Sequence, residues 1–73
     1  MERRETFAAR LSRARKERNI SQEKIAEAAK ISVRQYQKLE KGKAIPRLDT
    51  ACRLAEVLGF SLEHLVFSDL EKE

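Results

Sequence analysis

The sequence has few of the residues that interrupt helices, form disulfides or bind metals. Its 73 residues include two glycines, one proline, one cysteine and one histidine. A lone cysteine cannot form an internal disulfide, and no second cysteine or histidine is placed to complete a metal site. We therefore expect no disulfide, no metal and no cofactor, in a protein of a reducing, cytoplasmic compartment.

Long apolar runs are absent as well. No segment approaches the roughly 20 apolar residues that span a bilayer, and residues 1–5 lack the apolar core of a signal peptide. The aromatic residues are three phenylalanines and one tyrosine, which gives little support to RNA or single-strand binding through base stacking. Membrane-spanning and stacking-type RNA-binding proteins are thus disfavoured.

Residues that favour helices are abundant instead. Alanine, leucine, glutamate, lysine, arginine and glutamine dominate the composition. A chain of this length has room for one domain, and it buries only about 60% of its unfolded surface, so its stability margin should be thin. We expect one all-α domain over residues 1–73, with a core at about 4–67 and a frayed tail at 68–73.

Charge is divided unevenly along the chain. Residues 1–48 contain 14 Lys or Arg against 6 Asp or Glu, a net charge of +8. Residues 49–73 contain 2 against 6, a net charge of −4. A polyanion would therefore be drawn to one side of the molecule.

The first three helices are indicated by their ends. An apolar stripe at helical spacing predicts a helix over residues 4–18, which Asn19 would stop. Ser21 is a suitable N-cap for a second helix that runs to about Ala29. A short corner follows, and a third helix begins at Ser32.

The third helix has the clearest end signals. Ser32 and Gln35 fit a capping box at its start, and Gly42 is a left-handed stop at its end. Tyr36 and Leu39 lie one turn apart on its inner side. Its other side is rich in Gln, Arg and Lys, which can hydrogen-bond base edges and phosphates.

Two further helices are expected downstream. Pro46 opens or immediately precedes a fourth helix, whose inner stripe is Leu48, Ala51, Leu54, Ala55 and Leu58. Gly59 would end that helix. Ser61 would cap a fifth helix, with one apolar side formed by Leu62, Leu65 and Val66.

Several separate segments, in order and spacing, resemble the phage-repressor-type (Xre/Cro-like) helix-turn-helix family. They are S-Q-E-K-I-A-E-A-A, the corner ending in Ser32, L-E-K-G, and P-R-L-D-T followed by L-A-E-V-L-G-F-S-L-E-H-L. The likeness covers nearly the whole chain. It implies a lambda-repressor-like bundle of five helices, in which the third helix enters the major groove of DNA.

The resemblance also implies roles for individual residues. Base contacts are expected from Val33, Arg34, Gln37 and Lys38. Phosphate contacts or positioning are expected from Ser21, Gln22, Ser32, Gln35, Lys41 and Lys43. Gln22 would lie over a phosphate, where it can also support a neighbouring reading side chain. Arg15 and Glu40 match a partly buried ion pair that ties the first helix to the third.

One position departs from the family pattern. Lys30 stands at the corner where family members commonly have glycine. A left-handed conformation there would cost a non-glycine residue about 1 kcal/mol.

The chemistry of the proposed reading residues leaves alternatives open. Arg34 suits bidentate bonding to guanine, but it could also clamp a phosphate. Val33 could contact a thymine methyl or pack at the corner. Gln37 and Lys38 could read bases or hold phosphate.

No active site is indicated. Tyr36 fits core packing better than base stacking, because it shares the inner side of its helix. His64 has no carboxylate or cysteine arranged around it, and Cys52 fits a packing role. Helix capping accounts for the serines at 21, 32 and 61. We therefore do not expect an enzyme.

The function that these features favour is sequence-specific binding of double-stranded DNA by a transcriptional regulator, with repression as the default outcome. One module touches too few base pairs for a unique site, so a homodimer on an inverted repeat is expected. The expected dimer surface is Phe60, Leu65, Phe67 and Leu70, although Phe60 and Leu65 fit the core equally well.

Two other functions fit the sequence less well. The chain could be an antitoxin-like or adaptor protein that binds mainly another protein, with DNA contact for autoregulation. A membrane-surface role for residues 3–18 ranks last, because the other helices need to cover their apolar side.

Overall fold

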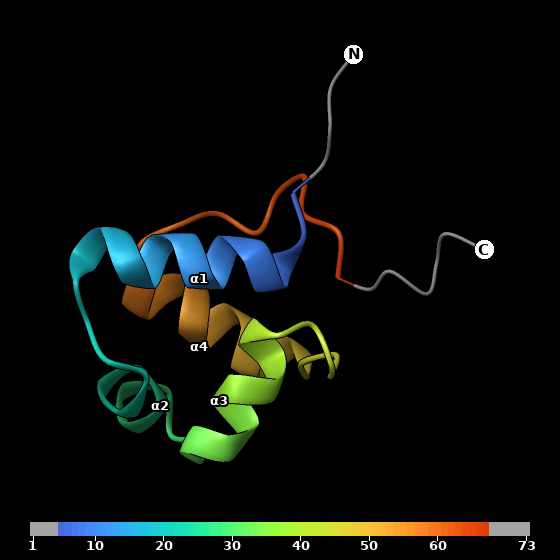
Figure 1. Ribbon diagram of the computed structural model, residues 1–73. Coiled ribbons are helices and arrows are strands. Elements are labelled where there is room, and N and C mark those ends of the chain that lie inside the picture. Colours follow the sequence, from blue (N-terminus) through green and yellow to red (C-terminus); the bar gives the residue numbers. More distant parts are fainter. Residues whose placement is uncertain (1–4, 68–73) are drawn as a thin grey trace.

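The described part of the chain is a bundle of four helices. The computed structural model describes residues 5–67. Its helices are α1 (Phe7–Arg18), α2 (Gln22–Ala29), α3 (Val33–Glu40) and α4 (Leu48–Leu58). In Figure 1, α1 crosses the upper part of the molecule with α4 behind it, and α2 and α3 lie below. The all-α class is confirmed.

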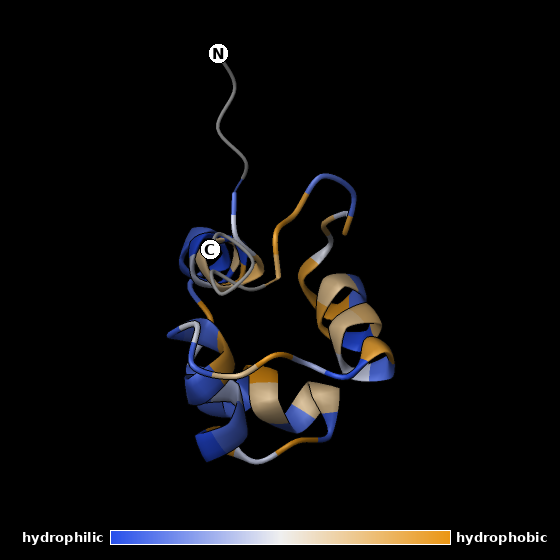
Figure 2. Cartoon of the chain, turned by 90° about the vertical axis from the view of Figure 1, so that its right-hand side faces the viewer, coloured by the Kyte–Doolittle hydropathy of each residue, from blue (hydrophilic) through white to orange (hydrophobic). Residues whose placement is uncertain are grey.

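Each helix buries one side in a common core. The core is formed by Phe7, Leu11, Ala14, Ile25, Ala26, Ala29, Tyr36, Leu39, Ala51, Leu54 and Leu58. The hydropathy of the ribbon alternates along the helices, as expected of helices with one buried side (Figure 2). Tyr36 is 0% exposed, so it packs in the core and is not available for stacking on a base.

Side-chain caps set the starts of the first three helices. The hydroxyls of Thr6, Ser21 and Ser32 each accept a hydrogen bond from a backbone N–H in the following turn. The predicted capping box is present: Gln35 N donates to Ser32 Oγ (3.0 Å), and Ser32 N donates to Gln35 Oε1 (3.3 Å). Because Thr6 caps α1, that helix begins at Phe7, three residues later than predicted.

The fifth helix that we expected is not formed. The segment that follows α4, residues 59–67, is extended and contains one turn, at which His64 has a φ of 66°. Phe7 N donates to Val66 O (2.8 Å) and Val66 N donates to Glu5 O (3.0 Å). A helix this short is costly to nucleate, whereas this pairing satisfies the backbone and stacks Phe67 on Phe7 with ring centroids 5.0 Å apart.

The predicted inner stripe of α4 is wrong at one position. Leu48 is 77% exposed; it is the first residue of α4, where no other element of the described fold covers it. Ala51, one turn later, is buried. Pro46 lies before the helix, and Arg47 is its N-cap without a side-chain hydrogen bond.

Two remaining features complete the description of the fold. Among residues 5–67, no helix is long and apolar enough to cross a membrane. The expected frayed tail at 68–73 lies outside the described residues.

Candidate nucleic-acid interface

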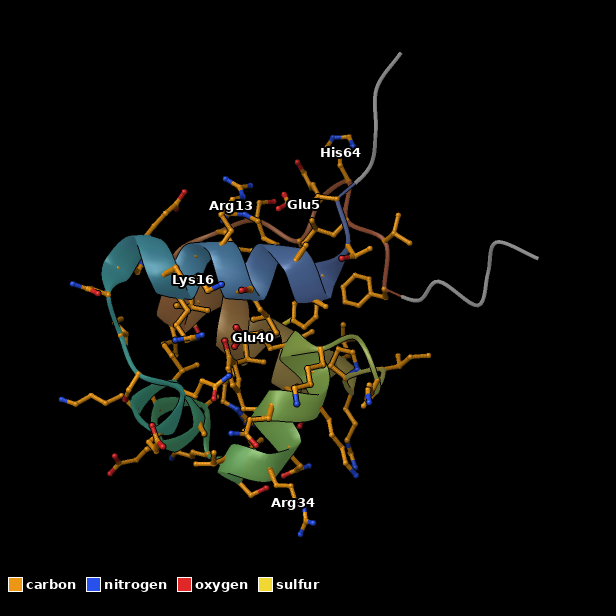
Figure 3. All side chains as sticks on the ribbon, viewed as in Figure 1. Glu5, Arg13, Lys16, Arg34, Glu40 and His64 are labelled. Carbon is orange, nitrogen blue, oxygen red and sulfur yellow. The ribbon has the colours of Figure 1, made fainter. Side chains whose placement is uncertain are left out.

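One polar edge of α3 faces solvent. Tyr36 and Leu39 point into the core from the opposite side of the helix. Since successive residues turn by about 100°, the outer edge carries Arg34, Lys38 and Lys41, all of which are exposed. Figure 3 shows Arg34 at the end of the molecule farthest from α1, directed away from the bundle. The third helix therefore presents a row of cations that nothing in the described fold covers.

The corner before α3 holds this edge outward. Lys30 ends α2 in the left-handed conformation, with a φ of 63° and a ψ of 41°. Its backbone N–H donates to Glu27 O (3.1 Å), and that of Ile31 donates to Ala26 O (3.0 Å). Ala26 and Ala29 are buried, and their small side chains let α3 approach α2 closely.

A chain of polar side chains links three helices behind the polar edge of α3. Arg15 of α1 donates from Nε to Glu40 Oε1 (3.1 Å) and from Nη2 to Glu40 Oε2 (2.9 Å). Gln22, the first residue of α2, donates from Nε2 to Glu40 Oε1 (3.3 Å). Gln37 of α3 donates from Nε2 to Gln22 Oε1 (3.1 Å). The chain of bonds thus runs Arg15, Glu40, Gln22, Gln37.

The ion pair at the start of this chain is largely withdrawn from water. The side chains of Arg15 and Glu40 are 16% and 9% exposed. Burial would raise the pKa of the Glu40 carboxyl, but hydrogen bonds from Arg15 and Gln22 outweigh it and lower that pKa. A further hydrogen bond from Arg15 Nη1 to Ile20 O (3.0 Å) fixes the guanidinium. Glu40 is therefore a carboxylate at neutral pH and can only accept hydrogen bonds.

The other predicted site residues fall into three groups. Ser21, Ser32 and Gln35 use their side chains to cap helices. Lys41 and Lys43 are exposed beside Gly42 at the end of α3. Val33 is half-buried and packs against the core, in agreement with the packing alternative.

The expected dimer surface is partly used inside the protomer. Phe60, Leu65 and Phe67 are half-buried and pack against the core. Arg10 lies over the Phe60 ring, with its guanidinium carbon 4.8 Å from the centroid. Leu70 lies outside the described residues.

Sequence reasoning missed two features of this region. The bond between Gln22 and Gln37 joins residues 15 apart, so no periodicity reveals it; a projection of α3 against the start of α2 could have indicated it. Ile45 and Leu48 are 62% and 77% exposed. Ile45 lines a small hollow together with Gln35 and Lys38 of α3, which places an exposed apolar side chain beside that helix.

The comparison with known families agrees with this geometry. The sequence pattern of the helix-turn-helix family matches residues 11–65, a segment that begins within α1 and includes α2, the corner, α3 and α4. No individual curated protein matches the chain. The chain belongs to the phage-repressor-type (Xre/Cro-like) helix-turn-helix family, a generally non-enzymatic family of DNA-binding regulators.

Proposed function

We propose that the protein is a transcriptional repressor that reads double-stranded DNA by placing α3 in the major groove. The observation that carries this proposal is the exposed edge of α3, formed by Arg34, Lys38 and Lys41 on a helix whose other side is buried. A groove lined by phosphates attracts such an edge, and the Arg34 guanidinium can bond guanine O6 and N7 together.

The contacts divide by position along α3. Arg34 and Lys38 lie on its exposed outer edge, and the half-buried Gln37 lies at the margin of that edge; all three are proposed to reach base edges. Val33 is proposed to contact a thymine methyl with the part of its side chain that the core leaves open. Lys41 and Lys43 follow at the end of the helix and are proposed to hold phosphates, which fixes register without reading sequence.

We further propose that two copies bind an inverted repeat, because one recognition helix touches too few base pairs for a unique site. Among residues 5–67, the large apolar side chains that the protomer leaves exposed are Ile45 and Leu48. They are flanked by Arg47 and Asp49, whose Nε and Oδ1 atoms are 3.6 Å apart. Adjacent charges of opposite sign are self-complementary under a twofold axis, so a second copy of the chain fits this surface.

Selection of bound duplexes from a random DNA library, at near-physiological salt, tests the function. The expected result is an inverted repeat whose half-site centres are about 10 bp apart. A reporter gene with that repeat placed over its promoter should then be silenced when the protein is present. Recovery of no preferred sequence would overturn the proposal and would favour an adaptor function, in which Ile45 and Leu48 contact a different protein.

A further inference from the structure

A hollow of about 130 Å³, here called the Lys41 hollow, lies between the start of α1 and the turn that follows α3. Its apolar wall includes Phe7, Leu39 and Phe67. Figure 1 shows the start of α1, the segment after α3 and the end of the described chain close together on one side of the molecule. An engineered apolar cavity of roughly 150 Å³ holds a benzene molecule. The Lys41 hollow can therefore accept one branched apolar side chain.

The surroundings of this hollow favour an anion. Among the described residues that line it, Lys41 is the only charged one, and Lys43 is exposed two residues further along. Ala8, in the first turn of α1, also lines the hollow, and its N–H donates to no acceptor within residues 5–67. Free N–H groups at the start of a helix carry partial positive charge. Glu5 lies before this turn, but its carboxylate is already held by Arg13 at 3.0 and 2.8 Å.

The chain continues from this hollow into an acidic segment, residues 68–73, which lies outside the described residues. It begins directly after Phe67, which lines the hollow. Three carboxylate residues against one lysine give the segment a net charge of −2, opposite to that of the hollow. Leu70 is its one apolar residue, and three extended residues span at most about 10 Å. Leu70 is therefore within reach of the hollow.

We propose that residues 68–73 cover the Lys41 hollow, with Leu70 inserted in it. The carboxylates of the segment then lie beside Lys41 and Lys43, so DNA must displace them before its phosphates reach these lysines. A short tether gives the segment a local concentration on the order of 1 mM, so even a contact with a Kd of about 1 mM is formed half of the time. The segment is thus an intramolecular inhibitor of DNA binding. This inference rests on the proposed function in one respect, that the two lysines hold phosphates.

NMR spectroscopy of the variant Leu70→Ser tests the contact without DNA. The variant keeps the charge of the segment and removes the side chain that fits the hollow. The backbone amide signals of Ala8 and Gly42, which line the hollow and are far from residue 70 in the sequence, should therefore shift. The signals of α2 should stay in place. Leu48→Ser, at the exposed start of α4, is the matched control and should move neither of the two hollow signals.

Two outcomes of this experiment would overturn the inference and leave the proposed function intact. One is that the signals of Ala8 and Gly42 are the same in Leu70→Ser as in the wild type. The other is that these signals move with protein concentration in the wild type, because a second copy of the chain would then occupy the hollow.

Binding to a scrambled duplex tests the competition, because phosphate contacts do not depend on the base sequence. Leu70→Ser should tighten this binding about twofold without any change in charge. The double variant Asp69→Asn, Glu71→Gln should tighten it about threefold. Its matched control is Glu56→Gln, Glu63→Gln, which removes the same charge from exposed residues that do not line the hollow. That control should tighten binding by less than about 1.5-fold.

Equal tightening by the two double variants, with Leu70→Ser unchanged, would mean that net charge alone acts on DNA, and the inhibitory role would be wrong. Absence of DNA binding in the wild type and in every variant would overturn that role together with the proposed function. The amide signals of Ala8 and Gly42 would still decide whether the segment occupies the hollow.

Discussion

The carboxylate of Glu40 holds α1, α2 and α3 together through its bonds to Arg15 and Gln22. Its pKa is lowered from the ordinary value of 4.5. A group whose pKa is lower in the folded state stabilises that state above its unfolded pKa, and the stabilisation is lost as pH falls through the folded pKa. Acid should therefore weaken the junction of the three helices from pH 4.5 downward.

The variant Glu40→Ala should lose about 3 kcal/mol of unfolding free energy at neutral pH, because it leaves the Arg15 guanidinium partly buried without its partner. Urea denaturation between pH 3 and pH 7 measures this. The loss should shrink toward the acid end, where the wild-type carboxyl is protonated as well. The Glu5→Ala variant compares this buried ion pair with an exposed one. Glu5 also has a lowered pKa, because it bonds to the exposed Arg13. A loss in Glu40→Ala that does not change with pH would contradict the ion-pair account.

A second prediction at the residue scale concerns the corner. Lys30 is left-handed with a φ of 63°, so Lys30→Gly should raise the unfolding free energy by up to about 1 kcal/mol. The same change at Lys24, inside α2, should lower it by about 1 kcal/mol. Thermal or urea denaturation of both variants gives the two signs. Equal destabilisation by both would mean that the corner does not adopt this conformation in solution.

At the scale of the element, the proposed complex has two kinds of DNA contact along α3. Arg34→Ala should relax the sequence preference. The binding free energy should fall by roughly 1–3 kcal/mol on the preferred site and change little on other sites. Lys43→Ala should weaken binding to all duplexes alike and reduce the salt dependence by about one counterion. Fluorescence anisotropy with a selected and a scrambled duplex, at several salt concentrations, distinguishes them. If both variants lost affinity equally for the selected and the scrambled duplex, the proposal that α3 reads the base sequence would be wrong.

The helix ends show which elements local sequence can predict. The sequence identified four helix ends correctly, because a cap depends on a residue and its near neighbours alone. These ends are at Asn19, Ser21, Ser32 and Gly42. Ser61 gave the same kind of signal, and its Oγ does accept a hydrogen bond from Glu63 N (3.1 Å). The helix nevertheless does not follow, since the next residues pair with the start of the chain, a contact that no local pattern contains.

The candidate site was predictable to a similar degree. The polar edge of α3 could be predicted, because helical spacing puts its residues on the side opposite the buried Tyr36 and Leu39. The resemblance to a family suggested the ion pair of Arg15 and Glu40, whose side chains lie 2.9 Å apart at their closest atoms. The direction of the bond from Gln37 to Gln22 was not predictable, because it depends on how three helices meet. Leu48 was misplaced because helical spacing does not show whether another element covers the start of α4, which depends on the whole bundle.

At the scale of the whole molecule, the proposed dimer gives a further prediction. Leu48 is 77% exposed, so Leu48→Ser should leave the melting temperature of the protomer nearly unchanged. It should lower affinity for an inverted repeat toward the affinity for a single half-site. Gel-shift titration on both duplexes, with sedimentation of the complexes, measures the effect.

The comparison variant for the dimer is Phe67→Ser. Phe67 stacks on Phe7, so Phe67→Ser, unlike Leu48→Ser, should lower the melting temperature of the protomer. If Phe67→Ser abolished dimer binding at a temperature where the protomer stays folded, and Leu48→Ser did not, the dimer surface would lie at the C-terminal segment.

The pairing of Val66 with Glu5 and Phe7 brings the two ends of the described chain to one place. Figure 3 shows Glu5 and His64 at the end of the molecule opposite Arg34. A fluorescent protein, an affinity tag or a surface tether joined before Glu5 or after Phe67 would therefore start at the end of the molecule opposite Arg34, away from the proposed DNA-binding edge. Circular permutation that links these two ends needs only a short connection, because their backbones are already hydrogen-bonded at 2.8 and 3.0 Å.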